Sequence, residues 1–100
     1  MSHHVASQAT SDLDDIWHYV AKESGSPEVA SRLIHSITDR FLLLSRHPYL
    51  GRSREDDFGV GRRSFAVGEY VIVYRVENNN DVLILRVAHG RRDIDAWFET

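Results

Sequence analysis

Cysteine is absent from this chain of 100 residues, proline occurs only twice, and Lys22 is the single lysine. Without cysteine, disulfide bonds and thiolate metal sites are excluded, and a reducing compartment is the expected location. No apolar run approaches the roughly 20 residues that a membrane helix needs. Residues 1–10 also lack the charged start and apolar stretch of a signal peptide. We therefore expect a cytoplasmic protein without membrane contact.

A strongly basic balance is lacking as well. The chain has 12 Lys and Arg residues against 15 Asp and Glu residues, a formal net charge of -3. This balance argues against a general nucleic-acid binder, which is usually basic. The hydrophobic fraction of 42% and the charged fraction of 27% are those of an ordinary globular protein. The length predicts a single domain over residues 1–100.

Two helices are predicted in the first half of the chain. Ser11 is a suitable N-cap for the first, and Asp14 completes a capping-box spacing. Gly25 then provides a C-terminal stop. Ser26 and Pro27 have the residue types preferred at the N-cap and N1 positions of a second helix. The apolar face of the first helix is expected to contain Leu13, Ile16, Trp17 and Val20.

The second helix carries an apolar stripe of about four turns and ends before Pro48. Its linker to the first helix is so short that the two are expected to form an antiparallel hairpin. The stripe consists of Ala30, Leu33, Ile34, Ile37, Phe41 and Leu44.

Strands are predicted in the second half, where the hydrophobic period changes to two. Residues 62–67, 69–76 and 82–88 should form an antiparallel meander, with residues 78–81 as a hairpin turn. Residues 1–10 permit a short edge strand, residues 48–51 a turn, residues 51–61 an exposed loop and residues 93–98 a short helix. The expected fold class is α+β, a helical hairpin packed on a small antiparallel sheet in the order β-α-α-β-β-β.

The strand at 82–88 ends in His-Gly-Arg-Arg-Asp, so His89, Arg91 and Arg92 reach the rim of the domain. We expect them to converge with Arg62 and Arg63, because both groups flank strands of the same meander. Converging guanidinium groups bind phosphates or carboxylates. The alternative is that Asp93 and the acids at 55–57 neutralise these arginines and the two loop arginines, Arg52 and Arg54. His89 is either a general acid or base or a hydrogen-bonded structural residue.

No metal or cofactor site is expected. Asp14 and His18 share a helix face, but two ligands do not make a metal site. Glycine-rich phosphate loops, Ser-His-Asp order and HExxH are absent from the sequence. Trp17 is expected in the core, whereas Trp97 and Phe98 form an apolar chain end suited to docking another protein.

Four sequence blocks occur in order along the chain: DLDDIWHYV at 12–20, HPYLGR at 47–52, YVIVYR at 70–75 and RVAHGRRD at 86–93. Together they resemble the ParE/RelE superfamily of type II toxin–antitoxin toxins, and the resemblance runs from about Ala9 to Trp97. It implies the same helical hairpin and sheet, with a strand at the N-terminus. It also implies a small antitoxin that binds and silences the toxin and supplies any contact with operator DNA.

The two branches of the superfamily differ in chemistry. RelE-like members cut messenger RNA on the ribosome, whereas ParE-like members inhibit DNA gyrase by binding. Val71 stands where the RelE-like pattern has an arginine, Ser64 replaces a basic residue, and Trp97 lies near the position of a tyrosine. Arg62 and Arg91 do fit that pattern, but the resemblance is closer to the ParE branch.

The resemblance therefore implies a gyrase inhibitor that acts without enzymatic chemistry, restricts growth or stabilises a plasmid, and contacts its target through Arg91, Arg92, Trp97 and Phe98. The alternative is a ribosome-dependent, metal-independent endoribonuclease that uses Arg62, His89 and Arg91. A third possibility is a regulatory member that binds an antitoxin and is harmless.

Overall fold

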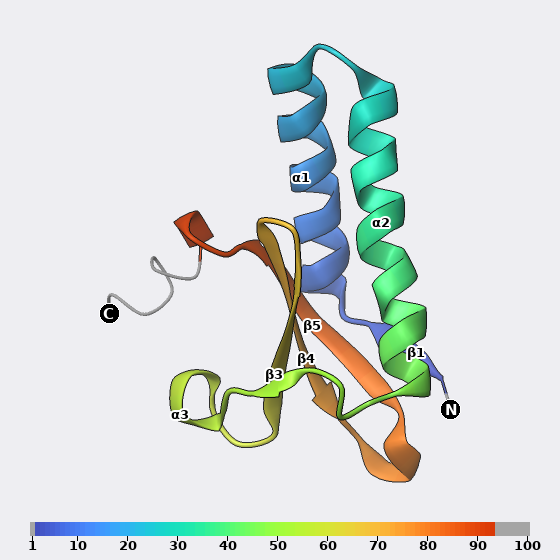
Figure 1. The fold of residues 1–100 in the computed structure, drawn as a ribbon, viewed down its shortest axis with the longest axis vertical. Coiled ribbons are helices and arrows are strands. Elements are labelled where there is room, and N and C mark those ends of the chain that lie inside the picture. The colour runs from blue at the N-terminus through green and yellow to red at the C-terminus, as the bar shows by residue number, and fades with distance from the viewer. Residues whose placement is uncertain (1, 94–100) are drawn as a thin grey trace.

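Two long helices pack on one face of a five-stranded sheet in the computed structural model, which describes residues 2–93 (Figure 1). This arrangement confirms the predicted α+β class. The short helix predicted at 93–98 lies almost wholly outside the described residues. In chain order the elements are β1 (His3–Val5), α1 (Ser7–Ser24), α2 (Pro27–Arg46), β2 (Arg52–Ser53), α3 (Glu55–Phe58), β3 (Arg62–Val67), β4 (Tyr70–Val76), the 3-10 turn η1 (Asn78–Asn80) and β5 (Val82–His89).

The sheet has the strand order β1-β5-β4-β3-β2. The three long strands form the predicted antiparallel meander, with positive φ angles at Asn79 and Asn80 in the turn between β4 and β5. The N-terminal strand is also present, but it pairs with β5 in parallel, which makes the sheet mixed. A parallel neighbour is possible here because α1 and α2 lie between β1 and the meander in the sequence.

The helical hairpin follows its predicted end signals except at its start. Ser26 accepts a hydrogen bond from the Val29 amide, Pro27 is the first helical residue, and Gly25 takes the left-handed conformation. The expected start at Ser11 is wrong, because α1 already begins at Ser7. The amide of Ala6 donates to Ile84 O at 2.9 Å, so pairing with β5 fixes the start of α1.

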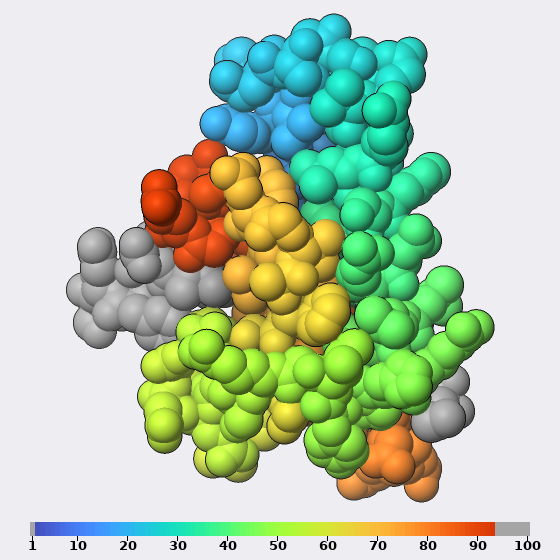
Figure 2. Space-filling view, viewed as in Figure 1, coloured from blue at the N-terminus to red at the C-terminus, as the bar shows by residue number. Residues whose placement is uncertain are grey.

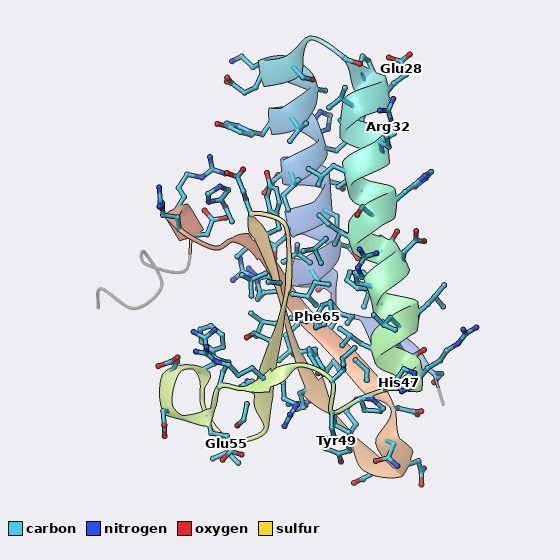
Figure 3. All side chains as sticks on the ribbon, in the orientation of Figure 1. Glu28, Arg32, His47, Tyr49, Glu55 and Phe65 are labelled. Carbon is cyan, nitrogen blue, oxygen red and sulfur yellow. The ribbon has the colours of Figure 1, made fainter. Side chains whose placement is uncertain are left out.

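The core lies between the hairpin and the sheet. Phe65 points from β3 towards this layer (Figure 3). β4 and β5 pair Val73 with Arg86 and Tyr74 with Ile84, which leaves Leu85 as a bulge. The bulge shifts the alternation of β5 by one residue, so Val87 continues the buried face instead of Arg86. The fully buried centre includes Ile37, Phe41, Leu44, Ile72, Tyr74, Val82 and Ile84.

The turn at 48–51 is held by a buried hydroxyl. Tyr74 Oη accepts the Gly51 amide at 2.9 Å and donates to Pro48 O at 2.8 Å. A Cβ atom at Gly51 would lie 2.7 Å from Ser64 O, so only glycine fits. The segment 51–61 is not the continuous loop we expected, because β2 pairs with β3 and α3 follows it. Within residues 2–93, no helix is long and apolar enough to cross a membrane.

Candidate functional site

The candidate site is the corner at the end of β5, residues 89–93, where the sequence places two adjacent arginines. Its backbone is tied down at three points: the His89 amide donates to Asp93 Oδ2 at 2.8 Å, the Arg92 amide to His89 Nδ1 at 3.2 Å, and the Gly90 amide to Glu69 O at 2.8 Å. The motif His-Gly-Arg-Arg-Asp is therefore a hydrogen-bonded turn that holds its arginines at the surface.

Both arginines of the corner are exposed. The Arg92 guanidinium lies over the ring of Tyr19 on α1, 4.7 Å from its centroid, and its hydrogen bond to Tyr19 raises the pKa of Arg92. Arg92 Nε also lies 3.7 Å from Asp93 Oδ1, as the neutralised alternative predicts for this arginine. Arg91 makes no ion pair within residues 2–93 and adjoins Glu69 and His89. The corner thus offers one oriented guanidinium and one unengaged guanidinium to a partner.

His89 has a structural role in this corner. Its Nδ1 accepts the Arg92 amide, and its ring meets Tyr70 edge to face with the centroids 5.5 Å apart. Burial raises the pKa of the Tyr70 hydroxyl. The remaining nitrogen, Nε2, lies 3.9 Å from the exposed carboxylate of Glu69. These contacts agree with the structural alternative considered for His89.

The expected convergence of the two arginine pairs is wrong. β3 and β5 run in the same direction, because each is antiparallel to β4. Arg62 therefore lies level with Arg75 and Leu83, whereas His89 lies level with Tyr70 and Val67. At about 3.4 Å per residue, the five steps from Arg62 to Val67 separate the two ends by about 17 Å. In Figure 2 the red C-terminal corner lies against blue α1, away from the yellow-green segment 52–61.

The arginines near the start of β3 differ from one another. Arg63 donates to Gly51 O at 2.6 Å and to Tyr49 O at 3.2 Å, so it braces the turn before β2. Arg54 pairs with Asp57 at 2.8 Å, as the neutralised alternative predicts, and Arg52 is exposed. Arg62 differs from these three arginines, because its Nη1 is buried without a hydrogen-bond partner.

An ion pair between Asp12 and Arg86 is the contact that sequence reasoning missed. Arg86 donates to both carboxylate oxygens of Asp12, at 2.8 and 3.0 Å, and the Val87 amide donates to the same group at 2.9 Å. The hydrogen bond to Asp12 raises the pKa of Arg86. Asp12 thereby accepts a backbone amide of β5 at a position past Ile84, the last residue of β5 that pairs with β1. An arginine inside an otherwise apolar strand was the available signal, but its partner lies 74 residues away.

A hollow of about 530 Å³ extends along the sheet from Arg62 to Arg86, which lies three residues before His89 of the arginine corner. Val73 and Leu85 form an apolar part of its lining, and Arg62 contributes the guanidinium noted above. No group of three or more potential metal ligands occurs among residues 2–93. The proposed contact residues Trp97 and Phe98 lie outside the described residues. Trp17, which we expected in the core, is only half-buried and is not part of the core cluster, and its Nε1 donates to Ser31 Oγ on α2 at 3.1 Å.

Comparison with known proteins gives a family match over most of the chain. The model of the ParE toxin of the type II toxin–antitoxin system parDE matches residues 4–94. Among solved structures, the chromosomal ParDE toxin–antitoxin system from P. aeruginosa is similar, with a TM-score of 0.76 and 24% identity over 89% of this chain and 95% of that one. The toxin–antitoxin complex RelBE2 from Mycobacterium tuberculosis has a TM-score of 0.61 and 24% identity, over 88% of this chain and 95% of that one. At 24% sequence identity, these two structural similarities show the fold alone. No curated protein matches.

Proposed function

The chain belongs to the ParE toxin family of type II toxin–antitoxin systems, and from this premise we propose that it inhibits DNA gyrase by protein–protein binding. A cognate antitoxin neutralises it in this proposal. The corner at 89–93 is the target-binding surface, with Arg91 and Arg92 as its described anchors and the apolar residues Trp97 and Phe98 following in the sequence. The proposal also places this protein in the cytoplasm together with gyrase, so binding requires no passage across a membrane.

The exposure of Arg91 is the observation that carries this proposal. Its guanidinium makes no ion pair within the described chain, and the turn beneath it is fixed by three hydrogen bonds. A rigid support for an unengaged arginine favours binding, because little conformational entropy is lost when a partner arrives. Arginine is also enriched among residues that dominate interface energies.

An antitoxin partner is supported by the family and by the two similar structures, which are a ParDE system and a RelBE2 complex. The net charge of -3 does not favour direct contact between this chain and the phosphates of operator DNA. In this proposal the antitoxin therefore supplies that contact. The ribonuclease alternative needs Arg62, His89 and Arg91 around one phosphate, and strand direction separates Arg62 from the other two by about 17 Å. Gyrase inhibition needs no such convergence.

A supercoiling assay with purified gyrase tests the proposal. We expect the protein to block supercoiling and the Arg91→Ala/Arg92→Ala double variant to need at least about tenfold more protein for equal inhibition, since interface arginines are frequent hot spots. Arg32→Ala is the matched control, because Arg32 lies on α2 far from the corner (Figure 3). Unchanged supercoiling at excess wild-type protein contradicts the proposal. New 5′ ends in messenger RNA after induction, detected by primer extension, would instead support the ribonuclease.

A further inference from the structure

Tyr19 on α1 lies beside the corner at 89–93 and carries one of its two guanidinium groups. The guanidinium carbon of Arg92 lies 4.7 Å from the centroid of the Tyr19 ring, and the two side chains share a hydrogen bond. Tyr19 is 47% exposed and does not belong to the core, so this contact forms at the surface. Figure 2 shows the red corner against blue α1, and the helix and the corner therefore form one continuous surface.

Two carboxylates near Arg92 compete with the tyrosine ring for its guanidinium group. Arg92 Nε lies 3.7 Å from Asp93 Oδ1, a distance too long for a hydrogen bond. Asp15 lines the same hollow between α1 and the corner, is exposed, and makes no ion pair within residues 2–93. A cation is attracted to the face of an aromatic ring, so Tyr19 holds the guanidinium against α1 and away from full pairing with either acid.

We propose that Tyr19 is a positioning residue of the target-binding surface, which holds Arg92 so that the edge of its guanidinium group meets a carboxylate of gyrase. The ring covers one face of the guanidinium, whereas the N–H donors lie in its plane and bind carboxylates bidentately. The Arg92 side chain is 50% exposed, so this edge is open to a partner. The inference rests on the proposed function, which supplies the partner, and it extends the surface from the corner onto α1.

The charges around the corner favour a carboxylate of a protein over the phosphates of a nucleic acid. Arg91 and Arg92 are surrounded by three acids, Asp15, Glu69 and Asp93. A phosphate backbone gains most from several free cationic groups, and here its repeated charges would also meet these acids. A single carboxylate gains from direct contact with one guanidinium edge at short range, so the acids matter less to it.

Inhibition of gyrase supercoiling by Tyr19 variants tests the proposal. Tyr19→Ala should need about two- to fivefold more protein for half-maximal inhibition, the range expected for an exposed cation–π contact. Tyr19→Phe keeps the ring and should inhibit like the wild type. A melting temperature close to that of the wild type is expected for both variants, because Tyr19 lies outside the core.

Tyr49→Ala is the matched control. Tyr49 is also an exposed tyrosine with an arginine over its ring, because the guanidinium carbon of Arg63 lies 5.4 Å from its centroid. Its hydroxyl contacts Asn80 in the turn before β5, whereas the corner follows the other end of β5. Tyr49→Ala should therefore inhibit gyrase like the wild type. A loss equal to that of Tyr19→Ala would overturn the assignment of Tyr19.

Nuclear magnetic resonance of the free protein tests the positioning without gyrase. Protons above the face of an aromatic ring are shifted upfield, so the side-chain protons of Arg92 should be shifted in the wild type and in Tyr19→Phe. In Tyr19→Ala this shift should disappear, whereas the resonances of Arg91 should not change. Arg92 protons without an upfield shift in the wild type would overturn the inference.

A double-mutant cycle then shows whether Tyr19 acts through Arg92. Tyr19→Ala should add little to the loss caused by Arg92→Ala, yet it should have its full effect in the Arg91→Ala background. A loss that adds in full to that of Arg92→Ala overturns the positioning role, because Tyr19 then contacts gyrase itself. Equal inhibition by the wild type and Tyr19→Ala overturns the inference and leaves the proposed function standing. If the wild type does not inhibit gyrase, the proposed function and the target role of Tyr19 fall together.

Discussion

Arg63, Arg86 and Arg91 carry the same guanidinium group, but their surroundings give each a different task. Arg63 donates to backbone carbonyls and braces a turn. Arg86 pairs with a carboxylate and joins a helix to a strand edge. Arg91 makes no described ion pair and is available to a partner. At this scale the role of a residue depends on the acceptors within hydrogen-bond distance.

Asp12→Asn should lower the free energy of unfolding by about 1–3 kcal/mol, because the substitution removes the charged acceptor of Arg86 and of the Val87 amide in a partly buried site. The side chain of Asp12 is 13% exposed, so little solvent screening weakens this contact. Urea denaturation followed by circular dichroism measures the change.

Asp14→Asn provides the comparison on the same helix. Asp14 is exposed and has no described ion pair, so its replacement should change stability by less than about 0.5 kcal/mol. Equal losses in the two variants would show that Asp12 contributes only through general charge on α1.

At the scale of elements, local end signals defined α2 but not α1. Ser26 and Pro27 mark the start of α2 in both sequence and structure. Ser11 has an equally suitable residue type, yet it lies inside α1. The pairing of β1 with β5 brings the chain into position at Ala6, and α1 continues from there. A suitable N-cap therefore predicts a helix start only where no strand has already fixed it.

This difference predicts contrasting effects of two serine substitutions. Ser26→Ala should destabilise the protein by about 1 kcal/mol, because its hydroxyl accepts the Val29 amide at 3.3 Å. Ser11→Ala should be neutral or slightly stabilising, since alanine is favoured in the exposed middle of a helix. Urea denaturation of both variants measures the effects. A loss at Ser11 as large as that at Ser26 would contradict the assigned start of α1.

At the scale of the whole molecule, the helical hairpin and the sheet share one core over only part of the hairpin. Figure 1 shows the hairpin extending past the sheet, with the α1–α2 connection at its far end. Residues 22–29 around this connection are mostly exposed, whereas Ile72, Tyr74 and Ile84 are fully buried. Stability is therefore expected to differ between the two ends of the molecule.

Native-state hydrogen exchange tests this difference. Amides near the α1–α2 connection should exchange through local fraying, at opening free energies well below that of global unfolding. Amides of Ile72, Tyr74 and Ile84 should exchange only on global unfolding, because their strands lie inside the sheet. Equal protection at both ends would contradict the unequal distribution of the core.

The sequence by itself determined the helical hairpin and the three long strands, because hydrophobic period, Ser26-Pro27, Gly25 and the asparagine turn act within a few residues of the chain. It did not determine the start of α1, β2 or α3. It also indicated the family, because the four short blocks and their order along the chain are visible without the three-dimensional structure. Only the tertiary structure decided that Arg62 and Arg91 lie at opposite ends of the meander and that Asp12 reaches Arg86. Those relations join residues far apart in sequence, and strand direction and register, which no local pattern records, place them in space.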